Sequence, residues 1–210
     1  MFIKSFNEPT QKLSLDSLST PIARAKEIMG ERFFGVEEVK KIFPKIFLDS
    51  EPEIAFSEKL LYSLNDKWRL VLVPNLSIEE MISLTDGFIH RYGDARYHLP
   101  LLARKGGDFS WELISVEPIA GSVGKDFSQQ TKLLKLGEKV PTSRQVIFLW
   151  LLEKSINEKI IFSDIYVRCH EKVGDYHTVV ASDGERVTIG GAISSLGYQN
   201  VGLAVSKSHF

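Results

Sequence analysis

Seven consecutive apolar residues, VIFLWLL at positions 146–152, constrain the fold of this 210-residue chain more than any other segment. Thr142 and Gln145 precede them at the spacing of a capping box, in which two side chains bond the free backbone groups at a helix start. A helix that is apolar on every side has no face for water and must be covered by other elements. We therefore predict a central, buried helix here.

The hydrophobic pattern changes from a helical period to a period of two after residue 160. Apolar and polar residues alternate over residues 165–169 and 201–206, and two further β-rich runs flank Asp183-Gly184. An Asp-Gly pair supplies the positive φ angles of a two-residue hairpin turn. The C-terminal residues are therefore predicted to form an antiparallel sheet with a tight turn at Asp183-Gly184.

Helix start and stop signals account for most of the preceding chain. Thr20 stands before Pro21 as a predicted N-cap, and Gly30 is expected to end that helix. Ser77 and Glu80 repeat the capping-box spacing. We predict helices over residues 21–29, 36–43, 56–64, 78–84 and 126–136, and strands over residues 69–73 and 111–116.

These patterns predict an α+β fold, with a helical N-terminal part that includes a few strands, a central buried helix and a C-terminal antiparallel sheet. We expect an N-terminal arm over residues 1–20, an α/β part over residues 21–140, and the buried helix plus sheet over residues 141–210. No internal repeat divides the chain, and the last two parts are expected to pack as one unit.

The charge balance bears on the partners of the chain. Lys and Arg total 26 against 27 Asp and Glu, so the positive field that favours nucleic-acid binding is missing.

The longest uncharged window, residues 187–206, is diluted by glycine and polar residues and does not predict a membrane span. Cys169 is the only cysteine, and the N-terminal residues show no export signal. Both features favour a cytoplasmic location.

Four potential metal ligands follow one another at intervals of four residues: Asp86, His90, Asp94 and His98. On a helix they would share one face, which suits a metal site. Glycines at positions 87 and 93 interrupt such a helix. We therefore expect ordinary surface groups on a loop, and we predict no bound metal.

The segment GSVGKD at residues 121–126 is similar in part to a phosphate-binding loop. It has two residues between its glycines where such a loop needs four, and Asp126 replaces the hydroxyl residue after the lysine. We predict instead a turn that leads into a helix with Asp126 as its N-cap.

A nucleophilic cysteine is an alternative that the sequence leaves open. His170, next to Cys169, would point to the opposite face of a strand. His177 is able to approach Cys169 across the sheet, with Asp175 to orient it, but a buried structural cysteine is the commoner case. We find no cofactor-binding motif and predict no cofactor.

Seven blocks of the chain resemble, in order and spacing, a family of short, uncharacterised bacterial proteins that is common in candidate-phylum genomes. The blocks are residues 28–38 (IMGERFFGVEE), 56–58 (FSE), 70–78 (LVLVPNLSI), 94–97 (DARY), 111–113 (WEL), 141–144 (PTSR) and 165–169 (IYVRC). The C-terminal part of this family also resembles the last strands of C-type-lectin-like folds. The resemblance implies a rigid sheet that displays loops, and we carry over no functional residue from the family.

The segments at residues 171–177 and 192–200 are therefore the candidate binding loops. They offer aromatic rings and hydrogen-bonding groups that suit contact with another molecule: Asp175, Tyr176, His177, Tyr198, Gln199 and Asn200. The plainer interpretation makes them ordinary turn residues. We favour a non-enzymatic binding module with a protein or glycan partner. The alternative is a small hydrolase or nucleotide-modifying enzyme that uses Cys169 with His177, or the Asp86 to His98 series.

Overall fold

The computed structural model describes residues 19–46, 48, 50–85, 87–91 and 102–207, so most of the predicted N-terminal arm lies outside the described residues. The helices are α1 (Ile22–Met29), the 3₁₀ helix η1 (Gly30–Arg32), α2 (Val36–Ile42), α3 (Glu58–Ser63), α4 (Ile78–Leu84), α6 (Phe127–Thr131) and α7 (Ser143–Ile156). The strands are β1 (Phe33–Phe34), β2 (Trp68–Val73), β3 (Ile89–Arg91), β4 (Ser110–Ser115), β5 (Glu138–Lys139), β6 (Tyr166–Val173), β7 (Tyr176–Ser182), β8 (Val187–Ile193), β9 (Val201–Leu203) and β10 (Ser206–Lys207). The α+β class is confirmed.

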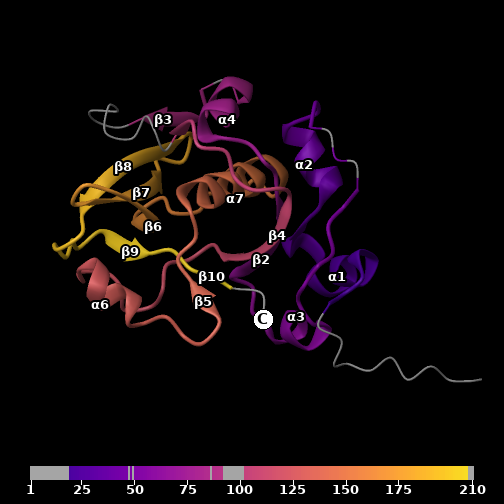
Figure 1. Ribbon diagram of the computed structural model, residues 1–210, viewed down its shortest axis with the longest axis horizontal. Coiled ribbons are helices and arrows are strands. Elements are labelled where there is room, and N and C mark those ends of the chain that lie inside the picture. The colour runs from indigo at the N-terminus through magenta and orange to yellow at the C-terminus, as the bar shows by residue number, and fades with distance from the viewer. Residues whose placement is uncertain (1–18, 47, 49, 86, 92–101, 208–210) are drawn as a thin grey trace, which may run out of the picture.

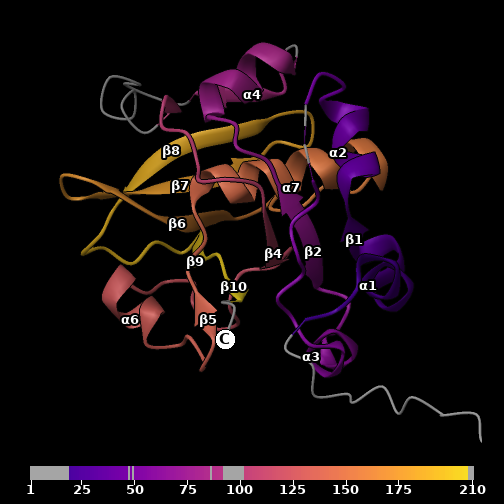
Figure 2. The same cartoon turned by 45° about the vertical axis from the view of Figure 1, so that its right-hand side comes forward.

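Helix α7 is the central element, as the apolar run predicts. The backbone N–H of Gln145 donates to the Thr142 hydroxyl, and the backbone N–H of Thr142 donates to Oε1 of Gln145 at 2.8 Å, so the capping box is confirmed. Each residue at positions 146–152 is at most 1% exposed. Figure 1 and Figure 2 show α7 between the two sheets, with α2 beside it. Burial on all sides is what its apolar surface requires.

The first sheet has the strand order β1-β2-β4-β10-β5. β2 and β4 form its antiparallel centre, from the pair Trp68 and Ser115 to the pair Val73 and Ser110. β1 joins β2 in parallel. All six residues of β2 are buried, which is typical of a strand that is covered on both faces.

The second sheet has the strand order β3-β8-β7-β6-β9 and is mixed, so the prediction of a purely antiparallel C-terminal sheet is wrong in part. β6, β7 and β8 are antiparallel neighbours, as predicted. The edge strands β3 and β9 run parallel to β8 and β6. Parallel pairing joins strands that are distant in the sequence, so no local pattern reveals it.

The last residues of the chain connect the two sheets. The alternating run at residues 201–206 is not one strand, because Val201–Leu203 pairs with β6 while Ser206–Lys207 pairs with β4 and β5. Buried side chains from both sheets and from α7 form one hydrophobic cluster. Within the described ranges, no helix is both long and apolar enough to cross a membrane.

Two helix predictions differ from the structure in detail. The Thr20 hydroxyl does not cap α1 and instead donates to the carbonyl O of Phe56 at 2.6 Å, because Thr20 lies in a β-bridge. Asp126 caps α6 as predicted, accepting the backbone N–H three residues ahead at 2.8 Å. However, α6 ends at Thr131, well before the predicted end, and Leu136 is 94% exposed.

The turn at Asp183-Gly184 is longer than predicted. Ser182 pairs with Val187, so four residues separate β7 from β8. Oδ1 of Asp183 accepts the backbone N–H of Arg186 at 2.7 Å, which closes the wider turn. Gly184 has a φ of +93°, so the need for glycine there is confirmed.

Candidate functional site

The second of the two segments predicted as binding loops starts beside the first, at one end of the second sheet. Tyr176 and Ile193 pair in the ladder of β7 and β8. The carbonyl O of Asp175 accepts hydrogen bonds from the backbone N–H and from the hydroxyl of Ser194, each at 2.7 Å. Residues 174–176 and 194–200, which meet at Asp175 and Ser194, are called the loop face below. From Ser194 the second segment runs along the sheet to Asn200, whose carbonyl O accepts the backbone N–H of Tyr166 at the start of β6.

Both loops are shorter than the sequence predicts. β6 and β7 leave only Gly174-Asp175 between them, so the predicted loop at residues 171–177 is mostly strand. Gly174 makes this tight turn possible with a φ of +57°. Ala192 belongs to β8. The pairing of β6 with β7 also shifts register between Arg168 and Lys172, and an alternating pattern does not reveal such a shift.

A buried arginine on β6, Arg168, supports the loop face from the interior. Its guanidinium donates to the carbonyl O of Ile193 (3.0 Å), of Leu196 (2.6 Å) and of Lys125 (3.1 Å), and to Oε1 of Gln130 (2.9 Å). Its Cζ also lies 5.7 Å from the ring centroid of Tyr198. One side chain thus holds the backbone of the loop face and the start of α6 together.

His177 belongs to this support and not to the exposed surface. It is 5% exposed, it stacks on Phe127 with 3.6 Å between ring centroids, and Nδ1 lies 2.7 Å from Oγ of Ser194. Burial, with the nearby charges of Lys172 and Arg168, lowers the pKa of His177 to about 4. The imidazole is therefore neutral at pH 7. Because the Ser194 hydroxyl already donates to a carbonyl, Nδ1 of His177 is the donor.

The other predicted binding residues reach the outer side of the loop face. Asp175, Gln199 and Asn200 are exposed, Tyr176 is 48% exposed, and Tyr198 is half-buried. Sequence analysis did not single out Leu196, which is 46% exposed and adds an apolar side chain to the same surface. The structure thus brings Asp175 and Tyr176 beside the start of the second segment, and His177 is buried next to Ser194. Asn200 does not join them, because its carbonyl O accepts the backbone N–H of Tyr166 at 2.8 Å, at the opposite end of β6 from the turn at Asp175.

Cys169 and His177 do not meet. Cys169 is fully buried in the core cluster that contains α7, together with Val180 of β7. Side chains alternate along a strand, so His177 points to the opposite face of the sheet from Val180, toward Phe127. Burial also raises the pKa of the Cys169 thiol well above its ordinary value. A thiol without a base or thiolate character is not an activated nucleophile.

Three members of the predicted metal-ligand series, Asp86, Asp94 and His98, lie outside the described residues. His90 is exposed on β3, which is a strand and not the helix that would align the series. Among the residues that the structure describes, no three His, Cys, Asp or Glu side chains gather as a metal site would require.

The residues that support the loop face, Arg168 and Gln130, were missed in the sequence. Gln130 is fully buried on α6, and its Nε2 donates to the carbonyl O of Ser122 at 2.9 Å and of Val201 at 3.1 Å. The available signal was a charged residue between two apolar residues of a predicted strand. Such a residue faces the interior only where several acceptors surround it.

The structure defines an α+β protein in which two mixed sheets enclose a helix and one sheet carries the loop face. Comparisons of the chain with family models, with curated proteins and with solved structures find no match. What the loop face can bind follows from its own residues.

Proposed function

We propose that this protein is a non-enzymatic binding module that contacts a protein or glycan partner through the loop face. The proposal is carried by Arg168, whose buried guanidinium bonds the carbonyl groups of Ile193 and Leu196 under an exposed surface. A surface that is rigid before binding loses less conformational entropy on association. A stable scaffold under exposed polar loops is a common design for recognition.

The exposed side chains of the loop face suit this role. Tyr176 and Leu196 provide apolar contact area, and Asp175, Gln199 and Asn200 provide hydrogen-bonding groups. Tyrosine combines a large contact area with few rotatable bonds. A ring beside amide groups matches a sugar ring with its hydroxyls, and it also matches protein side chains.

The proposed location is the cytoplasm, and no catalytic step is proposed. The free thiol of Cys169 is buried, which fits a reducing compartment. The two side chains considered for catalysis, Cys169 and His177, face different sides of their sheet. The C-type-lectin-like resemblance adds the expectation that the loops, and not a deep pocket, hold the partner.

A photo-crosslinker tests for a protein partner. Benzoylphenylalanine is placed at Tyr176 and, as a control, at Tyr62, which is 56% exposed on α3. In cells that express the chain, we expect a discrete adduct from position 176 and none from position 62. The adduct should disappear when Leu196→Ala and Gln199→Ala are added.

A glycan array tests for a sugar partner with the unmodified chain, Tyr176→Ala and the control Tyr62→Ala. Loss of a central aromatic contact should weaken binding about tenfold or more, while the control keeps full affinity. Equal adducts from both crosslinker positions would contradict the proposal. So would the absence of both a specific adduct and array binding.

A further inference from the structure

A hollow of about 340 Å³ lies between the start of α4, residues 104–107 and the start of α7. Basic side chains from separate parts of the chain line it: Arg104, Lys105, Arg144 and His170. The first two precede β4, whereas Arg144 is on α7 and His170 is on β6. Basic groups that converge in a concave site attract and orient anions.

The acidic groups beside these basic side chains already have partners. Oε1 of Glu80 lies 2.9 Å from Nζ of Lys105. Both carboxylate oxygens of Glu171 accept the backbone N–H of Ser143, at 2.8 Å and 3.0 Å, and one also accepts its hydroxyl. Among the described residues, no ion pair is formed by either arginine of the hollow. Glu171 keeps its negative charge, so the three cations Arg104, Lys105 and Arg144 exceed the two carboxylates Glu80 and Glu171 by one.

Arg144 is held in place without a carboxylate. It is half-buried, and Nη1 donates to the carbonyl O of Pro74. A Cβ at Gly106 would overlap the guanidinium, whereas a Cβ at Gly107 would meet no atom within 4 Å. Gly106 thus lets the main chain close against Arg144, and Gly107 leaves the neighbouring space open. Burial lowers the pKa of Arg144, and the nearby carboxylates of Glu112 and Glu171 oppose that shift.

We propose that this hollow binds a phosphate group, either free or as the ester of a small molecule. Guanidinium groups present a planar fork of donors that matches phosphate oxygens, and Lys105, which pairs with Glu80, borders the same hollow. Two unpaired arginines favour a dianion over a single carboxylate. Ligand pockets start at about 300 Å³, so the volume of the hollow admits a small phosphate ester.

Calorimetric titration of the full chain with inorganic phosphate and with glycerol 3-phosphate tests the proposal, with acetate as the control anion. We expect saturable binding of at least one phosphate compound and about tenfold weaker binding of acetate. Tighter binding of the ester identifies a phosphorylated molecule as the ligand. Equal or tighter binding of inorganic phosphate identifies the free anion.

Two arginine variants locate the binding. Arg104 is exposed, so Arg104→Gln leaves the fold intact and should weaken phosphate binding about tenfold. Arg186→Gln, in the exposed turn between β7 and β8, should leave it unchanged. The amide NMR signals of Gly106 and Gly107 should shift on titration with phosphate. The proposal is overturned if neither phosphate compound binds at millimolar concentration, or if Arg104→Gln and Arg186→Gln bind phosphate equally.

Discussion

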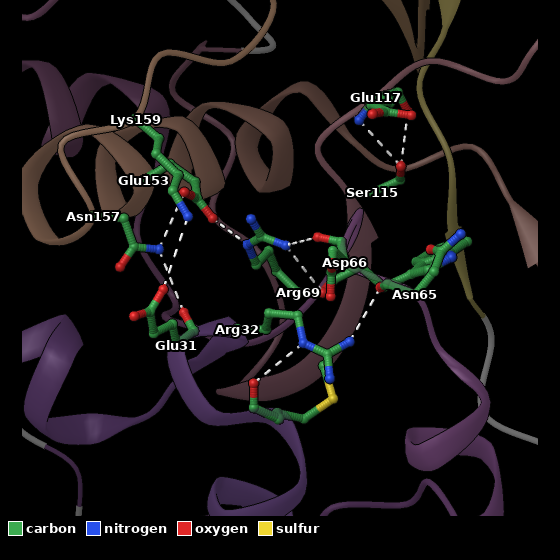
Figure 3. A network of polar contacts seen from close by, with 12 residues as sticks. Glu31, Arg32, Asn65, Asp66, Arg69, Ser115, Glu117, Glu153, Asn157 and Lys159 are labelled. Atoms are coloured by element: carbon green, nitrogen blue, oxygen red, sulfur yellow. Dashed lines mark hydrogen bonds and ion pairs between the residues drawn. The ribbon is translucent and has the colours of Figure 1, made fainter.

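Nε of Arg69 on β2 donates to Oε1 of Glu153 near the end of α7, and both side chains are removed from water (Figure 3). The other oxygen of Glu153 accepts from Nδ2 of Asn157 at 3.2 Å, and Nη1 of Arg69 donates to the carbonyl O of Asp66. Further hydrogen bonds thus support both partners of this ion pair, which ties the first sheet to the central helix.

Breaking the pair on one side should be costly. Glu153→Ala leaves the buried guanidinium of Arg69 without a counter-charge, so we expect the free energy of unfolding to fall by about 3–5 kcal/mol. The double variant Arg69→Met, Glu153→Leu should lose much less, because it leaves no buried charge. Urea unfolding of Glu153→Ala and of the double variant measures the two losses. Equal losses in the Glu153→Ala and double variants would refute this explanation.

Arg168 should control the order of the loop face. Arg168→Gln removes donors from several buried carbonyl oxygens, so we expect a loss of about 2–4 kcal/mol in the free energy of unfolding. Hydrogen exchange at the amides of Leu196 and Gly124, which bond within and against the loop, should accelerate. Arg186→Gln serves as the control and should change neither quantity. Unchanged exchange in Arg168→Gln would show that the loop is held by other contacts.

His177 should make stability depend on pH. Its pKa is about 4 in the folded chain against 6.5 for an ordinary histidine, so the unfolded chain takes up the proton first as the pH falls. The stability that neutral His177 contributes is complete above pH 6.5 and is lost between pH 6.5 and pH 4, up to roughly 3 kcal/mol. NMR titration of the His177 ring measures the pKa, and unfolding at pH 7 and pH 4.5 measures the effect. His177→Gln should reduce the difference between these two pH values. A ring that titrates near pH 6.5 would contradict the prediction.

Gly197 should not tolerate a side chain. A Cβ there would overlap the carbonyl O of Gly124, which is backbone and has little freedom to move. We expect Gly197→Ala to lower the free energy of unfolding by about 1–3 kcal/mol. Gly107→Ala is the matched control, because its Cβ enters open space, and thermal unfolding should hardly change. Similar melting temperatures for the two variants would disprove the close contact.

The sequence by itself determined the local elements of this protein. The run VIFLWLL and the pair Thr142 and Gln145 predict the burial and the start of α7, and the structure has both. Ser77 and Asp126 likewise start α4 and α6. These features depend on interactions over three or four residues, which a linear pattern records directly.

Only the tertiary structure decided which distant segments meet. It placed β9 and β10 in different sheets, added β3 to the edge of the second sheet, and set His177 beneath the loop face. Arg168 reaches acceptors between 25 and 43 positions away along the chain. Every strand offers the same backbone groups for pairing, so the partners are chosen by the packing of the whole core and not by any local pattern.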